Sequence, residues 1–190
     1  LGKAGECLNR ARNYTGMTDA DKAKRRELLG TARTFVEKAL ALEGGDRDDY
    51  KFHLATILLQ MGDVEHCRAI MYKLAPDDAN GYPHAHLWRG QMLREEFGLR
   101  SPIATTAIER HYTRAYESSK NDPDSQAMYA SAFSLANFFM VQRKYKEALP
   151  YLEKVEEKYA AQRLALGHVY QALGRPKDAQ KMFQSAEKHF

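Results

Sequence analysis

The strongest constraint on the fold is a pair of amphipathic patterns that recurs along the chain. It is clearest in residues 160–190, where two apolar patterns with spacings of three and four residues flank a Gly-Arg-Pro turn at 174–176. These spacings are those of one face of an α-helix. The residues that carry them are Leu166, Gly167, Tyr170, Ala179, Phe183 and Ala186. We therefore predict a helical hairpin, in which small residues let two helices approach closely and an aromatic ring fills the gap.

The same offsets recur in two other stretches, 129–159 and 48–82. In the first they fall on Leu135, Ala136, Phe139, Ala148, Leu152 and Val155, and in the second on Leu54, Ala55, Leu58, Cys67, Met71 and Leu74. The turns between the paired helices are predicted at Arg143-Lys144-Tyr145 and Met61-Gly62-Asp63. Repetition at a fixed period indicates a stack of supersecondary units, so the chain is predicted to be a helical-repeat protein.

Two regions match the pattern less closely. In residues 83–128, Gly90, Leu93, Tyr112 and Ala115 fit, but the turn is lengthened by an insertion near 97–107. Pro102 is predicted to begin the second helix there, where its missing N–H is harmless. In the N-terminal region the sequence predicts one long helix over 19–43. Its start signals are Thr18 and Asp21, its stop is Gly44-Gly45, and residues 2–14 form its partner.

These hairpins resemble the tetratricopeptide repeats, whose units run to about 34 residues. The resemblance is closest over 48–81 and 129–190, looser over 83–128 and loosest before 48. It implies an all-α fold, a right-handed superhelix of about five antiparallel hairpins. The whole chain, 1–190, is then a single array. Its units are an atypical N-terminal hairpin at 1–47 and repeats at 48–82, 83–128, 129–159 and 160–190.

The resemblance also implies a binding surface, because such arrays bind a peptide or a partner helix in a concave groove lined by their first helices. Carried over by position, the predicted lining is Phe52, Thr56, Leu59, Gln60, His84, Leu87, Trp88, Gln91, Arg94, Phe133, Asn137, Met140, Val141, Leu164, His168 and Gln171. This set is mostly apolar and aromatic, with scattered amides, which favours an amphipathic helix or an extended apolar peptide. For an aromatic such as Trp88 or Phe133, burial between hairpins is an equally open alternative.

One branch of the family grips the C-terminal carboxylate of heat-shock chaperones with lysine and asparagine. The matching positions here are not basic: they are Phe52, Thr56, Ala130, Phe133 and Ser134. We therefore predict that the chain is not a carboxylate clamp of that kind. The partner is expected to be a protein or peptide whose identity the sequence does not specify.

No catalytic, cofactor-binding or metal-binding constellation is found in the sequence. No phosphate-binding loop of the form G-x-x-x-x-G-K-[ST] is present. Seven histidines are present, but only His84 and His86 are closely spaced, and we interpret them as surface residues in the first turn of a helix. Cys67 falls on an apolar stripe and is predicted to be a small core residue. The chain is therefore predicted not to be an enzyme and to need no cofactor or metal.

Charge gives little support to nucleic-acid binding. The formal charge is +4, from 29 basic and 25 acidic residues. Lys22, Lys24, Arg25 and Arg26 form a basic cluster, which we interpret as a solvated helix face rather than a nucleic-acid or anionic-membrane patch. No stretch approaches the roughly 20 apolar residues that a membrane span needs. Because the chain begins at Leu1, we expect a processed or trimmed fragment, and the compartment stays open between cytoplasm and export or anchoring.

The C-terminal helix offers an alternative to groove binding. It carries Met182, Phe183, Ala186 and Phe190, and no polar capping helix follows it. Such an edge exposes apolar surface, so either the native chain continues or this edge self-associates. The main hypothesis is thus a non-enzymatic protein-interaction scaffold. The alternatives are a self-associating assembly element and, with less support, a helical-repeat nucleic-acid binder.

Overall fold

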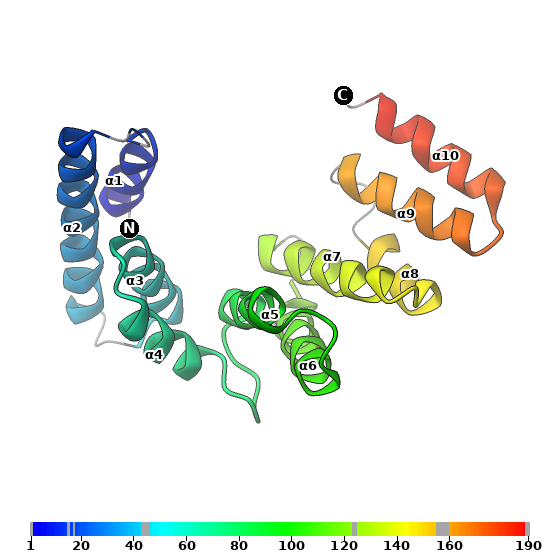
Figure 1. Ribbon diagram of the computed structural model, residues 1–190, viewed down its shortest axis with the longest axis horizontal. Helices are drawn as coiled ribbons and strands as arrows, with labels where there is room; N and C mark the ends of the chain where they lie inside the picture. The colour runs from blue at the N-terminus through cyan, green and yellow to red at the C-terminus, as the bar shows by residue number, and fades with distance from the viewer. Residues whose placement is uncertain are drawn as a thin grey trace. The chain divides into compact units, whose positions relative to one another are not determined.

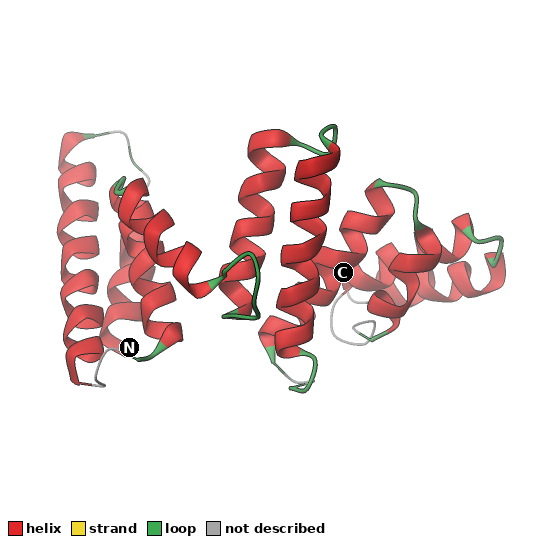
Figure 2. Cartoon of the chain, turned by 90° about the horizontal axis from the view of Figure 1, so that it is seen from below, coloured by secondary structure: helices red, strands yellow, loops and turns green. Residues whose placement is uncertain are grey.

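The computed structural model describes residues 2–14, 16, 18–42, 46–122, 125–154 and 160–188. Regular structure in these residues consists of ten α-helices, without a strand (Figures 1 and 2). The helices pair as antiparallel hairpins, and the all-α prediction is confirmed. By their contacts the residues divide into two compact units, Leu1–Pro76 and Asp77–Phe190. The single array over 1–190 therefore stays a prediction, and each unit is described separately below.

The first unit contains α1 (Gly2–Arg12), α2 (Asp19–Leu42), α3 (Asp48–Met61) and α4 (Val64–Leu74). Each helix packs on the next. The buried residues between them are mainly small or branched: Ala4, Ala11, Leu28, Leu29, Ala32, Val36 and Ile57. The long helix begins as predicted, because the Asp21 amide donates to the Thr18 hydroxyl at 3.1 Å. Its predicted stop at 44–45 lies outside the described residues.

The second unit contains α5 (Pro83–Phe97), α6 (Pro102–Ser119), α7 (Gln126–Val141), α8 (Tyr145–Glu153), α9 (Ala160–Ala172) and α10 (Pro176–Glu187). Helices α5/α6, α7/α8 and α9/α10 form its hairpins. Its core is continuous from α6 to α10, with Ile108, Phe138, Leu152 and Leu166 among its fully buried side chains. Helix α6 begins at Pro102, as predicted, and the Ser101 hydroxyl accepts from the Ala104 amide at 3.4 Å.

Two hairpins of the second unit are held together by a glycine that faces an aromatic ring. A Cβ atom built on Gly167 would lie 2.4 Å from Cε1 of Phe183, and one built on Gly90 would lie 2.5 Å from Cε1 of Tyr112. No real Cβ sits that close to a ring carbon, so each aromatic occupies space that only glycine leaves open. The predicted pairing of a small residue with an aromatic is thus present in α9/α10 and in α5/α6.

Helix α7 depends on a serine at its N-terminus, where the Ser125 hydroxyl accepts from the Met128 amide at 3.1 Å. Replacing Ser125 by alanine leaves that amide without its partner, so we expect the free energy of unfolding to fall by about 1 kcal/mol. Urea unfolding followed by the fluorescence of Trp88, the single tryptophan, would measure it. Ser118→Ala, at an exposed position of α6, is the matched control and should change stability by less than about 0.5 kcal/mol.

None of the helices in the described residues is both long and apolar enough to cross a membrane.

Candidate functional site

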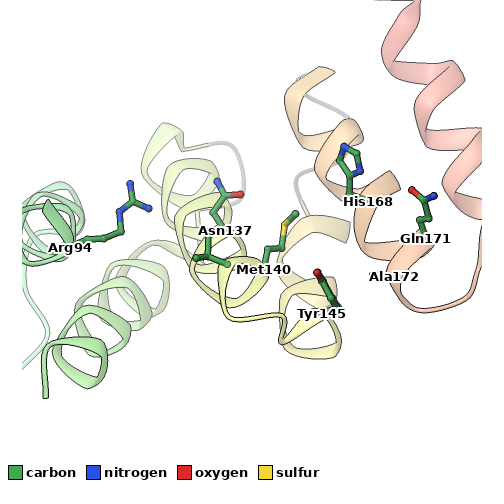
Figure 3. Close-up of a pocket in the computed structure, with 8 residues that line it drawn as sticks. Arg94, Asn137, Met140, Tyr145, His168, Gln171 and Ala172 are labelled. Atoms are coloured by element: carbon green, nitrogen blue, oxygen red, sulfur yellow. The ribbon is translucent and has the colours of Figure 1, made fainter. Parts of the chain in front are cut away.

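A hollow of about 690 Å³ lies on the second unit and is the candidate site (Figure 3). We call it the α7 hollow, because that helix supplies its middle. Its lining comes from the first helices of three successive hairpins and from the start of α8: Arg94, Asn137, Met140, Val141, Tyr145, His168, Gln171 and Ala172. Figure 3 shows Arg94 at one end and Gln171 at the other, with Asn137 and Met140 between them.

The repeat itself places these side chains. On α7, Asn137, Met140 and Val141 face the hollow, while Phe138 and Phe139 are buried in the core. On α9, the residues at the same repeat offsets, His168, Gln171 and Ala172, do the same. Because residues three and four apart share one helix face, burying one stripe in the core leaves residues of the opposite stripe facing the hollow. Arg94 on α5 has the offset of Met140 and Gln171 in its own repeat.

The polar groups of the α7 hollow have unused hydrogen-bonding capacity. Within the described ranges, the side chains of Arg94, Asn137 and Gln171 make no hydrogen bond or ion pair with other protein groups. His168 lies edge-on against Phe183, with ring centroids 5.2 Å apart. Val141 is 68% exposed in spite of its apolar side chain. The hollow therefore combines free amides and a free guanidinium with an uncovered apolar surface.

Comparison with solved structures shows what the fold of the chain resembles. The chain is similar to MamA (TM-score 0.56, 15% identity, covering 91% of this chain and 95% of that one). It is similar to BtubC (BKLC) from P. vanneervenii (TM-score 0.57, 13% identity, 98% and 88%). It is also similar to a Podosopora anserina putative kinesin light chain with nearly identical TPR-like repeats (TM-score 0.52, 18% identity, 96% and 92%). The chain has a tetratricopeptide-like fold. No family model and no curated protein matches its sequence.

Some of the predicted lining residues of the tetratricopeptide-like hairpins lie together in the structure. Asn137, Met140 and His168 line the α7 hollow with Arg94, Val141 and Gln171. Leu87 and Phe133 are instead half-buried and pack against the core of the second unit. Trp88 and Leu164 are half-buried outside the hollow, and the exposed Gln91 donates to Glu95 at 2.8 Å. Three predicted lining residues lie on α3 of the first unit: Leu59, which is exposed, and Phe52 and Thr56, which are half-buried. Their part in binding a partner stays a prediction.

Sequence reasoning missed Tyr145 and Ala172 as members of the hollow. Ala172 is the last residue of α9, and Tyr145 is the first residue of α8, a second helix. The resemblance assigns the lining mainly to first helices, so it did not point to Tyr145. A usable signal was present, because the turn at 142–144 brings the start of α8 directly after the end of α7, whose last residue lines the hollow.

The interpretation of His86 as a surface residue was wrong. His86 on α5 and His111 on α6 are both fully buried, and their Nδ1 atoms lie 2.9 Å apart. His111 Nε2 lies 3.2 Å from Oδ1 of Asp77, off the line of an ideal hydrogen bond, and Arg89 pairs with the same carboxylate at 3.0 Å. Position 86 faces α6 because it lies one turn before Gly90, which itself faces Tyr112 of α6.

The geometry assigns the protons of this pair. Only one Nδ1 carries a hydrogen, since two N–H groups would repel one another. If the Nδ1 of His86 donates, His111 carries its hydrogen on Nε2, which faces the Asp77 carboxylate. If the Nδ1 of His111 donated instead, the lone pair of its Nε2 would face that carboxylate and be repelled. The Nδ1 of His86 is therefore the donor. Burial, with the nearby Arg114 and Arg89 guanidinium groups, lowers the pKa of His86 to about 4. Burial, with Arg89, lowers the pKa of His111 to about 4 as well. The pair is therefore neutral near pH 7.

The structure also shows the environment of the buried cysteine, the basic cluster and the C-terminal edge. Cys67 is fully buried, as predicted, and burial raises the pKa of its thiol. In the basic cluster of α2, Lys22 pairs with Asp19 and Lys24 pairs with Glu27, each one helical turn away. In the described part of the chain, no group of three or more His, Cys, Asp or Glu side chains is arranged to hold a metal ion. At the C-terminal edge, Met182 and Phe183 pack against the core, and Phe190 lies outside the described residues.

Proposed function

We propose that the chain is a non-catalytic interaction scaffold whose α7 hollow holds a segment of a partner protein. The observation that carries this proposal is the pair of amides, Asn137 and Gln171, which make no hydrogen bond with the part of the chain that the structure describes and lie on either side of the apolar Met140 (Figure 3). An extended segment presents free backbone N–H and C=O groups at regular intervals, and side-chain amides can both donate to them and accept from them. The apolar lining then receives side chains of the segment.

The exposure of the lining supports a polypeptide over a small molecule. Sites for small molecules are concave and bury most of the ligand surface. Here Arg94, Val141, His168, Gln171 and Ala172 are all exposed, so the hollow is a shallow surface. A ligand gains enough contact on such a surface only if it extends along several helices, as a peptide segment does.

Charged substitutions in the hollow should abolish this binding. Val141→Glu combined with Ala172→Glu places two carboxylates on the apolar surface, at exposed positions where they leave the core unchanged. We expect at least a tenfold loss of affinity, because a desolvated charge without a partner costs more than about 1.4 kcal/mol. Peptides selected from a random display library on the wild-type chain provide the ligand, and fluorescence polarisation provides the affinity.

The control for that experiment is Ile103→Glu combined with Ala161→Glu. Ile103 is 84% exposed, Ala161 is exposed on α9, and neither lines the hollow. Peptides that bind the control pair and the wild type equally, but not the hollow variant, would support the proposal. Peptides that bind all three proteins equally would refute it. Self-association stays a separate prediction, and the molar mass of the chain in solution tests it.

A further inference from the structure

The α7 hollow carries a single formal charge. Among its eight lining residues Arg94 is the one permanent cation, and none is a carboxylate. The neighbouring Glu95 accepts from Gln91 at 2.8 Å, and within the described residues no ion pair joins it to Arg94. A guanidinium donates in a planar fork that matches a carboxylate. Arg94 therefore presents an unmatched positive charge at the α5 end of the hollow.

The C-terminal ends of α5, α7 and α9 lie near the hollow and oppose the positive charge of Arg94. Helix C-termini carry partial negative charge on free carbonyl groups and attract cations. At the ends of α7 and α9 several of those carbonyls are occupied. Phe139 and Met140 accept from backbone amides of the turn at 142–144, and Tyr170 and Gln171 accept from those of Gly174 and Arg175. Helix α8 also begins at the hollow, at Tyr145, with its positive end. The charge of Arg94 thus dominates.

We infer that the partner segment is an extended peptide with an acidic side chain at one end, whose carboxylate pairs with Arg94 while its main chain follows Asn137 and Gln171; this rests on the proposed function. Arg94 and Gln171 lie at opposite ends of the hollow (Figure 3). The acidic residue therefore lies at the α5 end, and the apolar and main-chain contacts follow along α7 and α9. This order along the segment is a specific expectation for any ligand.

The test measures both sides of the pair. Display selection on the wild-type chain should enrich peptides containing Asp or Glu. For those peptides Arg94→Glu should weaken binding about fivefold to tenfold, because it replaces an attraction by a like-charge repulsion. Arg94→Lys should retain most of the affinity. Changing the acidic residue of the peptide to lysine should restore binding to Arg94→Glu. The charge-matched control is Lys181→Glu, an exposed position of α10 outside the hollow, which should bind as the wild type does.

The outcomes separate this inference from the function on which it rests. One outcome is that peptides fail to bind the variant with Val141→Glu and Ala172→Glu but bind Arg94→Glu as tightly as the wild type. That result would refute the inference of an acidic partner and leave the proposed scaffold function supported. A selection that yields no peptide dependent on the hollow would overturn both. Enrichment of acidic peptides together with rescue by the charge swap would establish the pair.

Discussion

Replacing Gly167 by alanine is expected to lower the free energy of unfolding by about 1–2 kcal/mol. The new methyl group would lie 2.4 Å from a ring carbon of Phe183, and overpacking of this kind costs about 1–3 kcal/mol. The higher helix propensity of alanine returns up to about 1 kcal/mol of that loss. Urea unfolding followed by circular dichroism, and by Trp88 fluorescence for the second unit, would measure the change.

The same substitution at Gly30 is the matched control and has the opposite expected sign. Gly30 lies within α2 and has open space where a Cβ would go, so alanine there should stabilise the chain by up to about 1 kcal/mol. The hairpin α7/α8 supplies a second test, because the corresponding positions hold Ala136 and Leu152, both fully buried. The double variant Gly167→Ala with Phe183→Leu copies that pair.

In the double variant the two changes should couple favourably, by about 1–2 kcal/mol relative to their sum. Simple additivity, or a Gly167→Ala protein as stable as the wild type, would show that Phe183 does not require glycine opposite it.

Acid is expected to destabilise the second unit through the buried pair of His86 and His111. Their folded-state pKa of about 4 lies below the ordinary value of 6.5. Between these values the unfolded chain binds more protons, so stability rises with pH across this window. The stability that the neutral histidine pair contributes is fully present above pH 6.5 and is lost as the pH falls toward 4. Between pH 7 and pH 5 we expect a loss of about 2 kcal/mol for each histidine, or about 4 kcal/mol for the pair, measured by urea unfolding at each pH.

The control replaces both histidines by leucine. Exchanging both partners of a buried hydrogen bond for apolar side chains of similar size is nearly neutral, so stability at pH 7 should change little while the slope between pH 7 and pH 5 flattens. Replacing His111 alone leaves His86 with its Nδ1 unpaired, and should cost about 1–3 kcal/mol at pH 7. A double variant that keeps the slope of the wild type would assign the acid sensitivity to other groups.

The hairpins were predictable because their information is local. The spacing of Leu166, Gly167 and Tyr170 is the helical period, and Pro102 has a fixed backbone angle that suits a helix start. Such features act between residues that are near in sequence, so they do not depend on the rest of the fold. The insertion near 97–107 was predicted to lengthen the turn, but residues 102–107 belong to α6 and the turn itself spans only 98–101, so the hairpin α5/α6 stays intact.

The candidate site was predictable only in part. Asn137 and His168 share one repeat offset, so the register that places one in the hollow also places the other. Phe133 lies one turn before Asn137 on the same face of α7, but it packs against the core. The helical pattern alone does not tell which of the two side chains is buried. How far a side chain at a given offset is covered depends on the neighbouring hairpins, and a single-repeat pattern carries no information on them.

By itself, then, the sequence determined the helices, their pairing into hairpins and the small residues at which they approach. These follow from helical periodicity, proline and glycine, and all act within one repeat. The tertiary structure alone decided that Arg94 shares a hollow with Gln171 and that His86 meets His111. Each of these pairs unites residues 25 or more positions apart, and their proximity depends on how one helix packs on another.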